Sequence, residues 1–162
     1  HRQDLCWRHY GEYIMVQIKG DDDLIIQVVS AELAKSTGTS TTSTSYIDTG
    51  LTASITPATT GNKIKVTVVH NNRHQAASGQ DLQYYYQLLV GATVLDEVFA
   101  AGDNLGKLGD TAVYPFSHVQ TYIYTAPSTA TLTFKTQVKV AASTTAYYRY
   151  NDAFIILEEI TS

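Results

Sequence analysis

Two neighbouring runs between residues 45 and 69 alternate strictly between apolar and polar side chains. The apolar positions of the two runs are Leu51, Ala53, Ile55, Ile64, Val66 and Val68, and threonine, serine or lysine lies between them. Alternation with a period of two is typical of a strand with one buried and one solvated face. The segment between the runs contains Pro57 and Gly61, which favour turns. We therefore expect either a hairpin with a long loop or a strand that crosses between two sheets.

Strand patterns recur along the rest of the chain. We expect strands at residues 13–19, 24–29, 82–90, 93–100, 116–124, 132–140, 146–150 and 153–160. Together with the two runs, the pattern gives eight to ten strands spaced about 8–14 residues apart, and almost no helix. The sequence therefore predicts an all-β fold, an antiparallel two-sheet sandwich of the jelly-roll type.

Several segments carry more specific expectations. Residues 24–29 are apolar except for Gln27, which favours a central strand buried on both faces. Residues 31–35 have helical propensity but are too few to form a stable helix. We expect residues 36–44, 71–80 and 101–110 to form exposed loops or edges. Residues 1–20 are interpreted as an N-terminal docking arm with a short strand, and residues 21–162 as the jelly-roll domain.

Composition excludes several classes of partner. Charged residues make up 16% of the 162 residues, below the usual share of about 25%, and tyrosine is abundant with 12 copies. Such a surface suits an extracellular or virion protein. The net charge of -4 argues against nucleic acid as a partner, and no apolar run is long enough to cross a membrane. The single cysteine, Cys6, excludes an internal disulfide framework and is expected to be a free thiol.

No catalytic or metal-binding motif stands out. The acidic turn at residues 20–23 lacks the spacing of a calcium loop, and Cys6 with His9 supplies too few ligands for zinc. The four-residue spacing of two histidines, His70 and His74, is meaningful on a helix but not at a strand end. Asp96 and Glu97 are neighbours in a strand and should point to opposite faces. We therefore expect a non-enzymatic protein without a cofactor or metal.

Aromatic residues are the best candidates for binding. Within the arm, the expected docking residues are Trp7, Arg8 and Tyr10, a composition common in interface hot spots. The expected interface residues in the domain are Tyr84, Tyr85 and Tyr86, with Tyr85 facing opposite to the other two. A third set could instead stack on sugar rings of a glycan, namely Tyr147, Tyr148 and Tyr150.

A resemblance to a known family supports these expectations. The segments that carry it are 24–30 (LIIQVVS), 46–57 (YIDTGLTASITP), 62–66 (NKIKV), 124–129 (YTAPST), 150–151 (YN) and 155–160 (IILEEI). Over residues 24–160 the chain resembles small virion proteins of tailed bacteriophages, which serve as fibre, tail or head-appendage domains. The arm and the glycine-rich residues 101–110 depart from this pattern.

The resemblance implies a jelly roll similar to tumour-necrosis-factor and complement globular heads, which usually assemble as trimers. It further implies a structural protein of a phage virion: a fibre, tail, appendage or decoration unit that contacts other virion proteins through its arm. The alternative is a carbohydrate-binding module at a fibre tip that recognises a host-surface glycan.

Overall fold

In the computed structural model the described backbone comprises residues 9–10, 13–14, 24–33, 40–75, 82–102, 113–141, 147–150 and 153–162. These residues form strands joined by turns, and none of them lies in a helix. The strands are β1 (His9–Tyr10), β2 (Tyr13–Ile14), β3 (Ile25–Leu33), β4 (Ser40–Thr41), β5 (Ile47–Ile55), β6 (Lys63–Gln75), β7 (Leu82–Val90), β8 (Thr93–Gly102), β9 (Val113–Thr125), β10 (Leu132–Val140), β11 (Tyr147–Tyr150) and β12 (Ala153–Ile160). The described part of the chain accordingly has no helix able to span a membrane.

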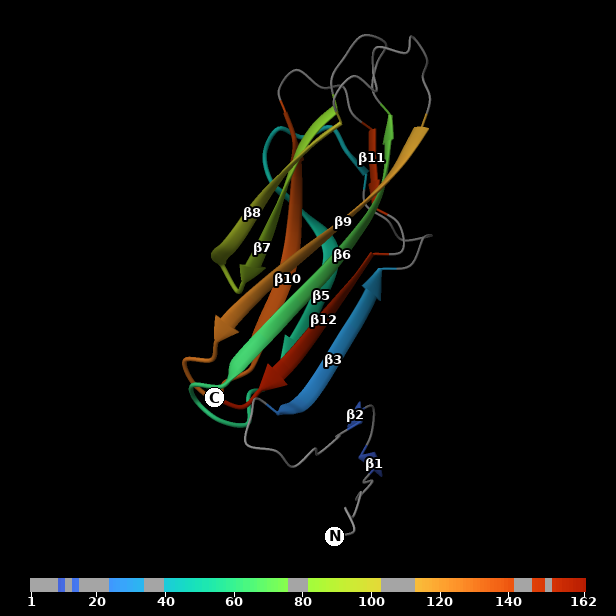
Figure 1. Ribbon diagram of the computed structural model, residues 1–162. Helices are drawn as coiled ribbons and strands as arrows, with labels where there is room; N and C mark the ends of the chain where they lie inside the picture. The colour runs from blue at the N-terminus through green and yellow to red at the C-terminus, as the bar shows by residue number, and fades with distance from the viewer. Residues whose placement is uncertain are drawn as a thin grey trace.

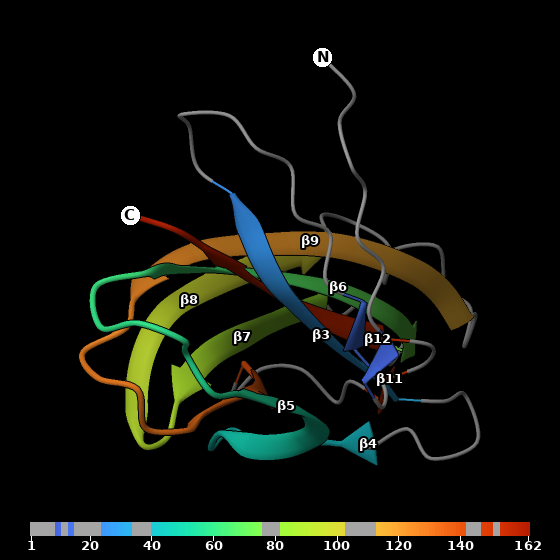
Figure 2. The ribbon, with the colours of Figure 1, turned by 90° about the horizontal axis from the view of Figure 1, so that it is seen from below.

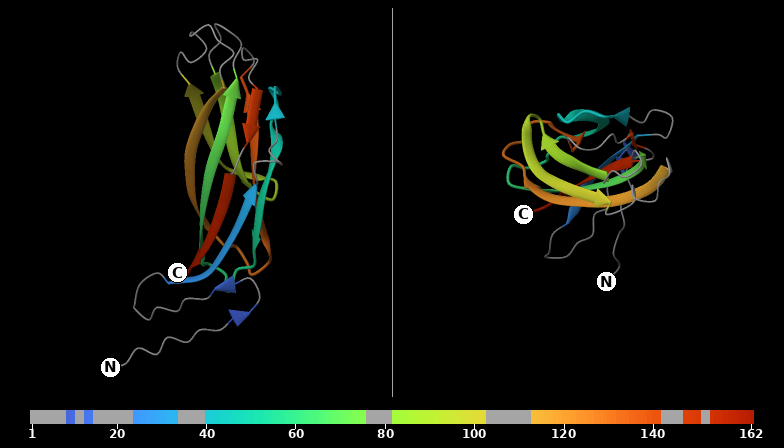
Figure 3. Two further views of the ribbon diagram at one scale, coloured as in Figure 1. Left: turned by 90° about the vertical axis from the view of Figure 1, so that its right-hand side faces the viewer. Right: turned by 90° about the horizontal axis from the view of Figure 1, so that it is seen from above.

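The eight long strands form two antiparallel sheets in jelly-roll order (Figure 1). One sheet has the order β5-β10-β7-β8, and the other has β3-β12-β6, with β9 on the far side of β6. The short strands β11 and β4 extend the second sheet, because β11 pairs with the end of β6 beyond β12. The two sheets face each other as layers (Figure 2), and β1 and β2 form a separate ribbon at the end that holds the C-terminus (Figure 3). The predicted antiparallel sandwich is confirmed.

The core lies between the two sheets and follows the predicted alternation. The six apolar positions that define the runs at residues 45–69 are all buried. Because β5 and β6 belong to different sheets, the segment between them crosses the sandwich, and the hairpin alternative is wrong. The largest fully buried side chains are Tyr84, Tyr86, Phe134, Leu51, Ile55, Ile64, Leu88, Ile155 and Leu157.

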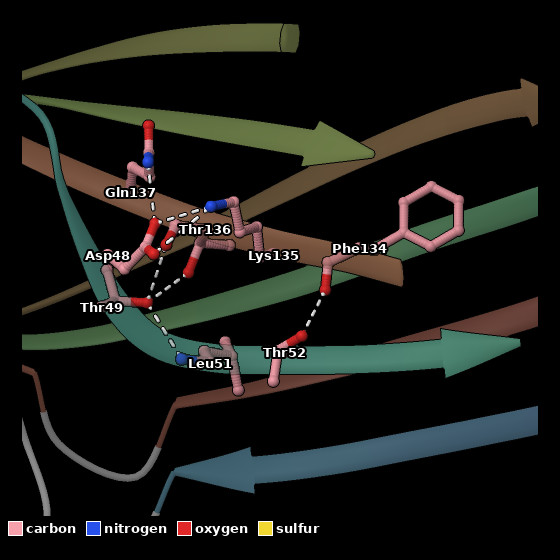
Figure 4. A network of polar contacts seen from close by, with 8 residues as sticks. All are labelled: Asp48, Thr49, Leu51, Thr52, Phe134, Lys135, Thr136 and Gln137. Atoms are coloured by element: carbon pink, nitrogen blue, oxygen red, sulfur yellow. Dashed lines mark hydrogen bonds and ion pairs between the residues drawn. The ribbon is translucent and has the colours of Figure 1, made fainter. Parts of the chain in front are cut away.

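A bulge shapes the edge strand β5 (Figure 4). Between two regular pairs with β10, three residues of β5 oppose Thr136 alone, and Gly50 among them has φ +89°, which favours glycine. The Thr49 hydroxyl contacts the Thr136 hydroxyl at 2.6 Å and accepts from the Leu51 amide at 3.1 Å. The bulge is therefore held by side-chain hydrogen bonds in place of regular ladder bonds.

Some predicted elements differ from the observed ones. The run at residues 24–29 was expected to be central and buried on both faces, but β3 is an edge strand whose Ile25 and Val28 are 41% and 40% exposed. An apolar run carries no periodicity that distinguishes an edge from a centre. Residues 31–33 extend this strand, so their helical propensity is overridden by pairing with β12. Similarly, β6 continues to Gln75 through an expected loop because β9 and β11 both pair with it.

Candidate assembly surface

The outer face of the six-stranded sheet carries apolar side chains among polar and charged ones. Val69 of β6 points to this face, and the strand register places Val119 of β9 and Phe154 of β12 on either side of it. Neighbouring rows add further aliphatic side chains. The surface, which we call the outer-sheet patch, consists of Val28, Val69, Val119, Ile123, Phe154 and Ile156.

The patch is accessible to a partner. Val119 and Ile123 are 58% and 51% exposed on the single chain. Lys65 and Glu158 lie between Val28 and Ile123 in one row of the sheet. They are joined by a salt bridge of 2.7 Å, so their opposite charges compensate each other. Exposed apolar side chains gathered on one sheet face are a feature of protein–protein contacts.

Strand β9 borders the patch and forms an open edge of its sheet. Among the described strands it pairs with β6 alone, and this pairing runs from Val113 to Thr125 without a register shift. By contrast, the other long edge strands, β3, β5 and β8, each have a register irregularity where they pair with their neighbours. Residues 113–125 also contain no Asp, Glu, Lys or Arg. Bulges, charges and proline are the usual protection of an edge against pairing. From residue 116 to residue 125 β9 has none of these, and Pro115 lies near its start.

The opposite sheet carries a different surface on its outer face. The Tyr85 ring is its centre. The centroids of the Tyr85 and Phe99 rings are 4.9 Å apart, and Lys139 Nζ lies 4.6 Å from the Tyr85 centroid. Lys139 also lies 4.4 Å from the Tyr46 ring centroid. Gln87 and Glu97 lie beside these side chains. We call the whole group the Tyr85 cluster, and it consists of Tyr46, Tyr85, Gln87, Glu97, Phe99 and Lys139.

Hydrogen bonds fix the Glu97 carboxylate within this cluster. Tyr46 donates its hydroxyl to Glu97 Oε2 at 2.6 Å, and Gln87 Nε2 donates to the same oxygen at 3.0 Å. These donors hold the pKa of Glu97 below its usual range. Burial, together with the neighbouring carboxylate, raises the pKa of the Tyr46 phenol. At neutral pH the cluster therefore combines a neutral phenol, a carboxylate and an ammonium.

A polar bridge joins the two sheets beneath these surfaces. Buried His70 contacts Gln120 (Nε2 to Oε1, 3.2 Å), and Gln120 Nε2 donates to Asp96 Oδ2 at 2.8 Å. The His70 ring also stacks on Tyr86 with 4.2 Å between centroids. Burial lowers the pKa of His70 to about 4, although its contact with Gln120 opposes this. His70 is therefore a neutral core residue at physiological pH.

The structure separates the sequence-predicted binding residues. Tyr84 and Tyr86 were expected at an interface, but both are buried in the core, so a partner cannot reach them. Tyr85 lies on the face opposite to these two, as predicted, and this face is the outer one. Asp96 and Glu97 point to opposite faces, as predicted. Tyr10 lies in β1. The side chains of the remaining candidates lie outside the described residues: Trp7, Arg8, Tyr147, Tyr148 and Tyr150.

Sequence reasoning missed most of the Tyr85 cluster. Tyr46, Glu97 and Lys139 are far apart in the sequence, and only the pairing of β10 with β7 and of β7 with β8 brings their segments together. The available signal was the alternation of β7, which placed Tyr85 on the face opposite to Tyr84 and Tyr86 without indicating which face was the outer one. The described residues contain no group of three or more His, Cys, Asp or Glu side chains that could hold a metal ion.

Comparisons with known proteins identify the fold. No protein-family pattern matches the chain, and no curated protein matches it. Among solved structures it is similar to dimeric latent PorU from Porphyromonas gingivalis, with a TM-score of 0.51 and 9% identity over 96% of this chain. It is also similar to VP2 in a subviral particle of infectious bursal disease virus, with a TM-score of 0.50 and 12% identity over 96% of this chain. The chain spans 14% of the PorU chain and 38% of the VP2 chain. Identities this low indicate a shared fold alone.

Proposed function

We propose that this chain is a non-enzymatic structural protein of a bacteriophage virion that assembles with copies of itself, as a trimer. In this proposal it serves as a fibre, tail or head-appendage unit, or as a decoration unit. The observation that carries the proposal is the outer-sheet patch beside the regular, uncharged edge of β9. Exposed apolar surface is unfavourable in water, and an open edge is a template for pairing with another chain, so a second copy that covers this side satisfies both.

The fold and the sequence pattern agree with a role in a particle. VP2 forms a subviral particle, and part of its chain is similar in structure to this chain. The likeness of residues 24–160 to tailed-phage virion proteins adds the virus type and the trimeric state to the proposal. In a cyclic trimer each copy contacts the next through two different surfaces, so the patch of one copy need not face the patch of its neighbour.

The mass of the protein in solution tests assembly. Light scattering of the purified full chain at micromolar concentration should give about three times the 17.8 kDa chain mass. Val119→Lys places a charge in the patch on the edge strand and should shift the protein to monomer. Val94→Lys is the matched control, because Val94 is a 47% exposed valine of the opposite sheet, and it should leave the mass unchanged. A wild-type monomer would overturn the proposal.

A second experiment tests the virion role. We propose that residues 1–12 attach the domain to other virion proteins. Deletion of these residues should leave a folded sandwich, measured by circular dichroism, but should remove the protein from purified phage particles, measured by mass spectrometry. Normal incorporation of the shortened chain would show that the arm is not required. Absence of the full-length protein from the particles would overturn the virion role itself.

A further inference from the structure

The Tyr85 cluster presents an exposed aromatic surface on the outer face of the four-stranded sheet. Phe99 is 51% exposed, although it packs against Tyr85 from the neighbouring strand. The two residues are direct cross-strand partners in the register of β7 and β8. The two rings are tilted by 40° to each other, and Lys139 lies over the Tyr85 ring, so Phe99 supplies the apolar surface that lies open to solvent.

Polar atoms beside this platform keep bonding capacity. The Lys139 ammonium contacts two ring faces, and it has no hydrogen-bond or ion-pair partner among the described residues. An ammonium has three N–H donors, so these remain available to a ligand. Both hydrogen bonds to Glu97 end on Oε2, which leaves Oε1 as an acceptor. A donor and an acceptor therefore lie next to an exposed ring.

These groups are held in place before any ligand arrives. Tyr46 and Gln87 orient the Glu97 carboxylate, and the rings of Tyr46 and Tyr85 hold Lys139 between them. Because little side-chain freedom would be lost on binding, such an arrangement favours affinity for a small ligand.

We propose that the Tyr85 cluster binds a neutral sugar residue of a glycan. A pyranose ring has a face of C–H groups and a rim of hydroxyls. Its C–H face stacks on Phe99, while neighbouring hydroxyls accept from Lys139 and donate to Glu97. This function goes beyond assembly and does not depend on the oligomeric state.

Charge and size select this ligand class. Lys139 and Glu97 carry opposite charges within one cluster, so the site has no net charge to attract an acidic sugar. The chain's net charge of -4 further disfavours acidic glycans. Six side chains suit one or two sugar rings, whereas a stable protein contact usually buries about 1,600 Å² in total. The outer-sheet patch is the better surface for a protein partner.

Two measurements on the full chain test the proposal. An array of neutral and acidic oligosaccharides should show binding to neutral members. Saturation-transfer NMR with the methyl glycosides of the array-selected sugars should then show contact through the ring C–H protons. Phe99→Ala should weaken binding about tenfold or more, and Phe99→Tyr should largely preserve it. Val94→Ala, on an exposed valine of the same strand, is the control and should bind as wild type.

Three results would overturn the proposal: no binding to any neutral glycan, a preference for acidic glycans, or unchanged affinity of Phe99→Ala. Cross-linking of this cluster to a protein partner, without glycan binding, would assign it to protein recognition instead. The mass of Phe99→Ala in light scattering should equal that of the wild type. Phe99→Ala therefore tests glycan binding, and Val119→Lys separately tests assembly.

Discussion

At the scale of single residues, position in the sheet decides what chemically identical side chains do. Tyr84, Tyr85 and Tyr86 are consecutive, yet the outer two are buried in the core and the middle one centres a solvent-facing cluster. The two buried rings meet edge to face, with 5.3 Å between centroids. The pKa of Tyr84 is raised by burial, so this phenol stays neutral in the core.

Burial predicts different costs for the same substitution at two valines. Val66 is 0% exposed, so Val66→Ala should lower the free energy of unfolding by about 2–3 kcal/mol, through lost burial and the cavity left behind. Val94→Ala, at an exposed position, should cost no more than about 0.5 kcal/mol. Urea denaturation of both variants measures this difference. Equal losses would contradict the assignment of core and surface.

His70 should make stability depend on pH. Its pKa in the folded protein, about 4, is below the ordinary value of 6.5. The unfolded chain therefore binds a proton at His70 more readily, and stability falls as pH decreases from about 6.5 towards 4. The free energy of unfolding should fall by about 3 kcal/mol over this range, and no part of this loss is expected above pH 6.5. Neighbouring His118 disfavours the protonated form, while Gln120, which also binds Asp96, favours it.

His70→Gln isolates this contribution from that of the carboxylates. Urea denaturation at several pH values between 4 and 7 should give a shallower decline for His70→Gln than for the wild type. If both proteins lost the same stability over this range, His70 would not be the group responsible.

At the scale of elements, the edges of the two sheets are treated differently. β5 is interrupted by its bulge and carries Asp48, which accepts from Lys135 and Gln137 across the strand pair (Figure 4). β9 is long and regular, and its one such feature is Pro115 near its start. The regular, uncharged part of β9 after Pro115 is therefore the edge most open to pairing with another strand.

The β5 bulge depends on a glycine conformation. Gly50 has φ +89°, and a Cβ added there would meet nothing closer than Leu33 Cδ1 at 3.6 Å. Gly50→Ala should therefore cost about 1–2 kcal/mol through backbone strain and not through a clash. Gly50→Asn should cost less, because asparagine tolerates this conformation better. Thermal melts that rank alanine equal to or milder than asparagine would contradict this explanation.

The elements also show what the sequence could predict. Strict alternation located the faces of β5 and β10, and the bounds of β7 and β12 match the expected ones. An apolar run without alternation gave no information on whether β3 was central or at an edge. The continuation of β6 beyond His70 could not be predicted, because its polar residues show no apolar alternation. They are held in the strand by pairing with β9 and β11, which are distant in sequence. Contacts between distant segments likewise formed the Tyr85 cluster.

At the scale of the whole molecule, the two outer faces differ in chemistry. The six-stranded sheet presents mainly aliphatic side chains around a compensated ion pair and beside an open edge. The four-stranded sheet presents aromatic rings beside charged groups. The first suits a copy of the same chain and the second suits a sugar. Because the core separates the two surfaces, a trimer formed through one would keep the other accessible.

If copies assemble through the outer-sheet patch, folding and association are linked. Unfolding of a trimer releases three chains, so mass action makes the melting temperature rise with protein concentration. For a domain of this size we expect a rise of about 2–4 °C for each tenfold increase. Differential scanning calorimetry of the wild type over a range of concentrations measures this. Val119→Lys, if monomeric, should melt at one temperature throughout, whereas Val94→Lys should follow the wild type. A wild-type melting temperature that is independent of concentration would mean that the exposed valines and isoleucines of the patch do not bind a second copy.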